Sequence, residues 1–127
     1  MKTVNTQGKL ITVLELIIRI SLFLVFAIAG SGKFDSQSVM AENFIRWNLG
    51  IPIMFFVGFS EILGAVLLLF TKTLKYAIIL LSGVMLGATG IHFLNWDEMG
   101  FPGLNLLLLF LLMLILQVNL KLLARKL

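Results

Sequence analysis

The sequence predicts an all-α integral membrane protein, a four-helix bundle whose N- and C-termini are cytoplasmic. The chain of 127 residues is 60% hydrophobic and only 13% charged, and its mean hydropathy is +1.08. Soluble domains of this length do not have such a composition. The apolar residues fall in four stretches, each near the roughly 20 residues that cross about 30 Å of hydrocarbon. No alternating strand pattern accompanies them, so residues 1–127 are expected to form a single transmembrane domain.

The four expected helices cover residues 10–30, 51–70, 74–94 and 104–123. Lys2 and Lys9, followed by the first apolar run, resemble the start of a signal peptide, but Glu15 and Arg19 lie inside this run. The apolar core of a signal peptide is only about 7 to 15 residues long, so we expect this helix to be retained. The fourth helix is almost entirely aliphatic and offers no distinctive face for a partner.

Basic residues set the expected orientation, because loops on the cytoplasmic side carry an excess of lysine and arginine. Lys33 and Arg46 lie on one side of the membrane. The other side receives Lys2, Lys9, Lys72, Lys75, Lys121, Arg125 and Lys126. We therefore expect both termini in the cytoplasm of a multi-pass protein in the cell membrane, namely a bacterial inner membrane. The net charge of +4 reflects this topology, and no basic stripe with interleaved aromatics indicates nucleic-acid binding.

Composition also limits the chemistry. The chain has no cysteine and one histidine. The absence of cysteine excludes a disulfide relay, a thiolate nucleophile, an iron–sulfur cluster and a zinc–thiolate site. One histidine excludes a bis-histidine haem within a monomer. We expect no metal site and find no recognisable cofactor motif.

Charged residues inside the apolar runs are the main candidates for function. A charge at the bilayer centre costs at least about 2.5 to 3.5 kcal/mol, so each must find a partner or a polar cavity. At 1.5 Å per residue, Arg19 lies roughly 14 Å from Leu10 and Glu61 about 15 Å from Ile51, so both reach the midplane. We therefore expect an interhelical Arg19–Glu61 ion pair, with Glu15 one helical turn below Arg19. Two carboxylates would then share one guanidinium, leaving a group that can bind a proton.

A second polar tier is expected nearer the non-cytoplasmic side, where His92 and Lys33 fall at one level. Two interpretations of His92 stay open. It is either a structural histidine at the membrane interface whose hydrogen bonds are satisfied, or a group that transfers protons or binds a ligand. The Arg19–Glu61 pair is likewise a structural lock or a functional site. Glycines at close spacing predict close contacts between membrane helices. Gly58 and Gly64 flank Glu61 in the second helix, and Gly83 and Gly87 lie in the third helix.

Several short motifs resemble the DoxX-like family of four-helix membrane proteins, over about Ile17 to Leu116. They are Arg19, Gly30-Ser31-Gly32-Lys33-Phe34, Ile51-Pro52, Glu61-Ile62-Leu63-Gly64 and His92. Relatives in this family include a small membrane subunit of a thiosulfate:quinone oxidoreductase, components of redox-stress complexes and a eukaryotic assembly chaperone for ligand-gated channels. Glu15 and the loop of residues 95–98 match no feature of the family pattern. A shared fold is only an analogy for chemistry.

Two functions of different class follow. In the first, the chain is a small quinone-interacting subunit or accessory of a membrane redox system, whose Arg19, Glu61, His92 and Lys33 hydrogen-bond a quinone while a protein partner supplies electrons. In the second, it is a non-enzymatic assembly or accessory protein whose buried charges are structural and which docks on a larger complex. A small-solute or proton transporter comes third, because the chain lacks paired discontinuous helices and would need to form a homo-oligomer.

Overall fold

The computed structural model describes the backbone of residues 2–126 and the side chains of residues 6–124. All regular elements in this part of the chain are helices, joined by short turns and loops, and it contains no strand. The side chains of Lys2, Arg125 and Lys126, which contribute to the orientation argument, lie outside the described residues. The elements are α1 (Lys2–Ser31), η1 (Gly32–Phe34), α2 (Val39–Arg46), α3 (Ile51–Leu68), η2 (Thr71–Thr73), α4 (Leu74–Leu94), α5 (Trp96–Met99) and α6 (Gly103–Lys126).

Four of these helices, α1, α3, α4 and α6, are long and apolar enough to cross a membrane. The prediction of an all-α membrane protein with four spans is therefore confirmed for the described residues. The first helix is longer than expected, because it begins at Lys2 instead of residue 10. The backbone of residues 2–9 is helical although this segment is polar in sequence. Which end faces the cytoplasm stays a prediction.

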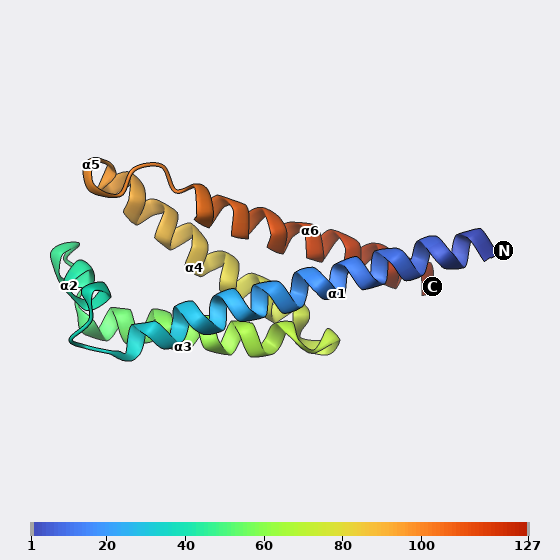
Figure 1. Cartoon of the computed structure of the whole chain (residues 1–127), viewed down its shortest axis with the longest axis horizontal. Helices are drawn as coiled ribbons and strands as arrows, with labels where there is room; N and C mark the ends of the chain where they lie inside the picture. The colour runs from blue at the N-terminus through green and yellow to red at the C-terminus, as the bar shows by residue number, and fades with distance from the viewer. Residues whose placement is uncertain (1, 127) are drawn as a thin grey trace.

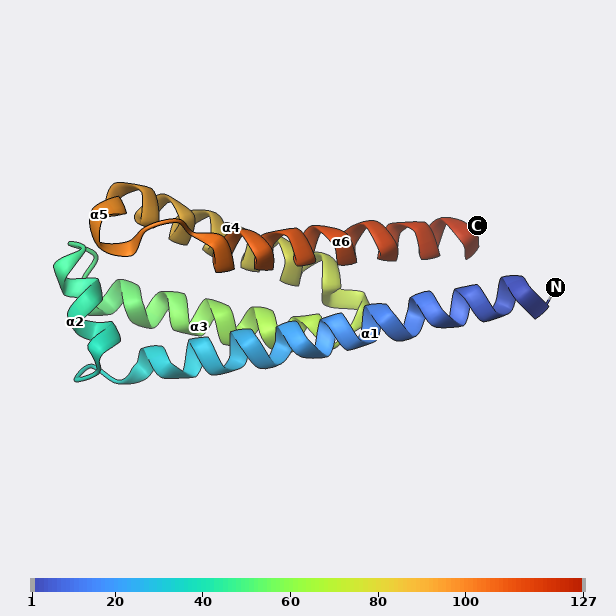
Figure 2. The ribbon, with the colours of Figure 1, turned by 45° about the horizontal axis from the view of Figure 1, so that its top comes forward.

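The long helices are packed in a ring that follows their order in the chain (Figure 1). α1 packs along α3, α3 against α4, and α4 against α6, while α6 meets α1 over a shorter contact. Both views show α3 and α4 closest at η2 and diverging toward α2 and α5 (Figure 2). We call the end with α2 and α5 the loop end, and the opposite end, where α1 begins and α6 finishes, the terminal end.

The hydrophobic core lies where all four long helices meet. It is made of large aliphatic side chains with a few alanines, and Phe26 supplies its aromatic ring. Because the bilayer is as apolar as this core, packing and close approach hold such helices together more than burial from water does. The buried core residues are Leu22, Phe26, Ala65, Leu68, Leu74, Ala77, Ile78, Leu81, Met85, Leu108, Leu112 and Ile115.

The short helix α2 folds back onto the start of α3. Its N-cap is Ser38, whose hydroxyl oxygen accepts a hydrogen bond from the backbone N–H of Ala41 at 3.1 Å. Its buried face consists of Ala41 and Phe44, which pack against Met54 of α3. The Ser38 cap satisfies one of the backbone N–H donors that every helix start leaves without a partner.

Replacing Ser38 with alanine is expected to destabilise α2 by about 0.5–2 kcal/mol, the usual cost of losing an N-cap side chain. Amide hydrogen exchange in Val39–Arg46 should become faster, while the core amides of α4 keep their protection. Ser36→Ala is the matched control, because Ser36 lies in the preceding turn and does not cap α2. Equal exchange rates in the two variants would show that the cap does not hold α2.

Candidate functional site

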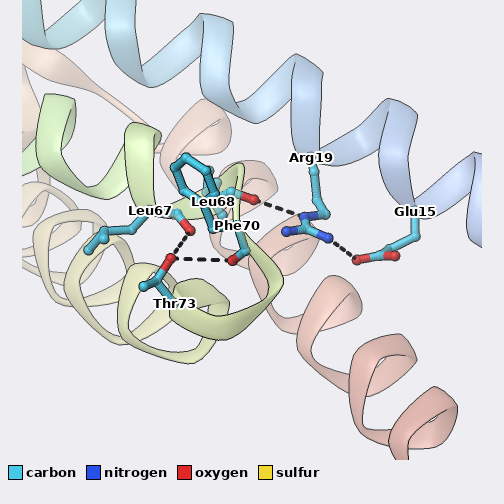
Figure 3. Close-up of polar contacts among 6 residues, drawn as sticks. All are labelled: Glu15, Arg19, Leu67, Leu68, Phe70 and Thr73. Carbon is cyan, nitrogen blue, oxygen red and sulfur yellow. Dashed lines mark hydrogen bonds and ion pairs between the residues drawn. The ribbon is translucent and has the colours of Figure 1, made fainter.

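The first polar cluster lies where α1 passes the end of α3 (Figure 3). Arg19 and Glu15 are both buried, with 6% and 7% of their surface exposed. The Nη1 of Arg19 lies 3.2 Å from the Oε1 of Glu15, one turn earlier on the same helix. The Nε of Arg19 donates to the backbone carbonyl of Leu68 at 2.9 Å. We call Glu15, Arg19 and this carbonyl the Arg19 cluster.

The position of this cluster follows from the end of α3. The last carbonyls of a helix have no partner within the helix and carry a partial negative charge. Thr73 donates its hydroxyl to the carbonyl of Leu67 at 2.9 Å, and Arg19 satisfies that of Leu68. A cation on α1 therefore caps the C-terminus of α3. The hydrogen bond links two residues, Arg19 and Leu68, that lie 49 positions apart in the sequence.

One nitrogen of the Arg19 guanidinium makes no hydrogen bond within the described residues. A guanidinium carries five N–H donors, and two of its three nitrogens are engaged by Leu68 and Glu15. The third nitrogen, Nη2 of Arg19, is buried and has no hydrogen-bond partner among the described residues. A buried donor without a partner costs about 1–3 kcal/mol. This atom can hold a hydrogen-bond acceptor that comes from outside the chain.

The second polar cluster joins η1, at the end of α1, to α3 closer to the loop end. The Nζ of Lys33 lies 2.7 Å from the Oε1 of Glu61, and their side chains are 12% and 3% exposed. Lys33 also donates to the carbonyl of Ala29 at 3.2 Å. The pair lies beside a close crossing of the two helices, because a Cβ built on Gly58 would stand 2.9 Å from the Cβ of Lys33. We call Lys33 and Glu61 the Lys33 pair.

The expected ion pair between Arg19 and Glu61 is wrong. Arg19 binds Glu15 and the end of α3, and Glu61 binds Lys33 instead. Leu68 lies opposite Arg19, and Glu61 precedes Leu68 by seven residues, which is roughly 10 Å along α3. The depth count failed because it assumed that the apolar runs of α1 and α3 end at the same level, whereas α1 continues well past the end of α3 (Figures 1 and 2).

His92 does not join either cluster. It lies half-buried in the last turn of α4, and its Nδ1 has no hydrogen-bond partner within the described part of the chain. Asn95 donates to the carbonyl of Ile91 at 3.1 Å and so only closes the end of α4. The expected polar tier of Lys33 with His92 is therefore reduced to the Lys33 pair, with His92 on a separate helix.

The four glycines of interest divide between two environments. A Cβ built on Gly58 would lie 2.8 Å from the carbonyl of Gly30 in α1, and one on Gly64 would lie 2.5 Å from the side chain of Leu81 in α4. Gly58 therefore allows α3 to approach α1 closely, and Gly64 allows it to approach α4. A Cβ on Gly83 or Gly87 would meet nothing within 4 Å. The expected contact at these two positions is absent from the described chain, because they lie on the outward face of α4.

Sequence reasoning missed a groove between α1 and α6. The groove has a volume of about 210 Å³, and its walls are aliphatic except for Glu15. The lining residues are Ile11, Leu14, Glu15, Ile18, Leu114, Ile115 and Val118. The uniform aliphatic run of α6 contains no contrast that could have marked these positions. Only Glu15 carried a signal, since it is a carboxylate inside an apolar run.

A further ion pair joins α2 to α5 at the loop end, between Arg46 and Glu98. Its side chains are 57% and 40% exposed, so solvent weakens the attraction. Glu98 belongs to the loop that the family resemblance left unexplained. The pair connects the loop-end segments of α3 and α4, whose helices diverge there (Figure 1).

Comparisons with known proteins agree with the motifs in the sequence. The model of a family described as the DoxX-like family matches residues 17–115, which is most of the chain. No curated protein and no solved structure gives a significant match. The matched region begins after Glu15 and includes Arg19, Lys33, Glu61 and His92.

Proposed function

This chain belongs to the DoxX-like family, and from that premise we propose that it is a small membrane subunit or accessory of a redox system, with a quinone site at the Arg19 cluster. The observation that carries the proposal is the buried Nη2 of Arg19, which has no partner among the described residues. This donor suits a quinone carbonyl oxygen. Glu15 holds the same guanidinium and also lines an aliphatic groove.

The charges of the Arg19 cluster favour an uncharged ligand. Glu15 and Arg19 neutralise each other at 3.2 Å, so the cluster has donors to offer but little net charge. Binding sites for small molecules combine apolar walls with a few well-placed polar groups, as this region does. In the proposal, the chain binds and orients the quinone, and a partner protein carries the group that exchanges electrons with it.

The proposal uses fewer residues than the sequence suggested. The Lys33 pair is separated from Arg19 along α3 and satisfied within the chain, so we assign it a structural role. His92 lies on α4 and makes no hydrogen bond or ion pair with either cluster among residues 6–124. We leave it outside the quinone site. Glu15, which the family pattern does not include, becomes part of it.

Quinone content of the purified protein tests this function. The wild type, extracted directly into native lipid particles, should contain quinone at a higher ratio to lipid than the bulk membrane. Arg19→Lys should lose that enrichment, because lysine keeps a cation near Leu68 and Glu15 but has no counterpart of Nη2. Mass spectrometry of organic extracts measures the ratio, and circular dichroism checks that both proteins are folded.

The matched control is the double variant Lys33→Leu/Glu61→Leu, which removes the other buried ion pair without leaving an unpaired charge. It should keep the quinone. If wild type, Arg19→Lys and the double variant all matched the bulk membrane, the quinone site would be refuted. Loss in the double variant alone would move the site to the Lys33 pair.

A second candidate is an accessory protein without a ligand, whose buried charges only hold the helices in place. It is favoured by the fact that Glu15, Lys33 and Glu61 all have partners within the chain, as structural ion pairs do. Under this function the protein docks on a larger membrane complex. The absence of quinone enrichment in the wild type, together with co-purification of a defined complex, would support it.

A further inference from the structure

We propose that the groove between α1 and α6 holds the isoprenoid tail of the quinone, which enters sideways from the leaflet at the terminal end. This inference rests on the proposed quinone site at Arg19, and it adds a second part to that site. The two parts have separate residues and can therefore fail separately.

The groove lies between two helix ends that extend beyond their neighbours. In both views α1 and α6 continue past η2, the turn that joins α3 to α4 (Figures 1 and 2). Arg19 of α1 is level with Leu68 at the end of α3, so Ile11, Leu14, Glu15 and Ile18 precede that level. On the opposite wall, α6 contributes Leu114, Ile115 and Val118. No part of α3 or α4 lines this groove.

Glu15 makes the groove continuous with the Arg19 cluster. Its Oε1 is bound to the Nη1 of Arg19 at 3.2 Å, and the same side chain forms part of the groove wall. A ligand with its polar head at Arg19 and a hydrocarbon tail directed past Glu15 would occupy both parts. Such a molecule needs an uncharged head and an apolar chain.

The volume and charge of the groove select the tail of a neutral lipid. The groove volume of about 210 Å³ is smaller than the roughly 300–1,000 Å³ of pockets that enclose a whole small molecule, so it suits one part of a hydrocarbon chain and not a whole ligand. The one charged side chain on its wall is the carboxylate of Glu15. Because Arg19 neutralises this carboxylate at 3.2 Å, the region offers the phosphate of a phospholipid no net positive charge, so the uncharged head of a prenylated quinone fits better.

Filling the groove tests the inference. Leu114→Trp adds bulk to the wall, and Leu120→Trp is the matched control on the exposed surface of the same helix. Binding is measured in detergent by equilibrium dialysis, with a prenylated quinone and with a tail-less quinone that has the same head. We expect Leu114→Trp to weaken the binding of the prenylated quinone about tenfold, close to 1.4 kcal/mol, and to leave the binding of the tail-less quinone unchanged. Leu120→Trp should bind both quinones as the wild type does.

Each outcome has one meaning. Unchanged binding of the prenylated quinone to Leu114→Trp, with Arg19→Lys still defective, overturns the tail groove and leaves the quinone site standing. If neither quinone binds to the wild type, the quinone site itself is refuted. Binding of the tail-less quinone also shows that Leu114→Trp is folded. A photoreactive phospholipid that labels Leu114 and Val118 more strongly than a photoreactive prenylated quinone does would assign the groove to the bilayer lipid and overturn the inference.

Discussion

Replacing Lys33 with leucine is expected to destabilise the protein by about 3–5 kcal/mol, the usual cost of removing one partner from a buried ion pair. The change leaves Glu61 with its side chain 3% exposed and without its partner. Glu61→Leu should cost less, because Lys33 lies in η1 at the end of α1 and its long side chain can extend toward the interface. The order of the two losses is thus part of the prediction.

The double variant Lys33→Leu/Glu61→Leu should return to within about 1 kcal/mol of the wild type, or exceed it, because apolar replacements of a buried ion pair are often neutral or stabilising. Unfolding in mixed micelles, with a rising fraction of a denaturing detergent, measures the free energy of unfolding of all three variants. Arg46→Leu is the control, since it removes a cation from an exposed ion pair and should cost no more than about 1 kcal/mol. Additive losses in the double variant would show that the two residues do not form a pair.

The four spans could be predicted from the sequence because hydropathy and length together define a membrane helix. The expected range of residues 74–94 agrees with α4, and residues 51–70 and 104–123 differ from α3 and α6 by at most three residues at either end. The burial of Glu15, Arg19 and Glu61 also follows, since charges inside apolar runs turn away from lipid.

The expected placement of Glu15 beside Arg19 on the same helix is confirmed. The partners of Arg19 and Glu61 on neighbouring helices could not be predicted, because they depend on how far one helix is displaced along its neighbour. Hydropathy locates the ends of a helix against the bilayer to within several residues. An error of seven residues, from Glu61 to Leu68, is enough to exchange the partner of Arg19. The registration of α1 against α3 depends on the contact between Gly30 and Gly58, and no hydropathy profile contains it.

Small residues posed a similar problem in α4. Gly83 and Gly87 have the spacing of a helix contact, but spacing alone does not say which side of the helix is covered. α3 lies between α1 and α4 and is in contact with both, so its glycines have neighbours on two faces. α4 has an outward face instead, and Gly83 and Gly87 lie on it.

Replacing Gly30 with alanine is expected to destabilise the packing of α1 on α3 by about 1–3 kcal/mol, the usual cost of overfilling a packed contact. A Cβ at this position would stand 2.8 Å from the backbone carbonyl of Gly58 and 3.1 Å from the Cβ of Glu61. A backbone atom cannot turn away as the end of a side chain can, so the helices must separate. The same reasoning applies to Gly58→Ala, whose Cβ would lie 2.8 Å from the carbonyl of Gly30.

Gly83→Ala is the matched control and should have the opposite sign. Its Cβ meets nothing within 4 Å, and alanine in a helix interior is favoured over glycine by about 0.5–1 kcal/mol. Unfolding of all three variants in the same mixed micelles gives the comparison. If Gly30→Ala were as stable as Gly83→Ala, α1 and α3 would not be in close contact at this crossing. The displacement that separates Arg19 from Glu61 would then lose its physical basis, and the single ion pair between them would again be the simpler arrangement.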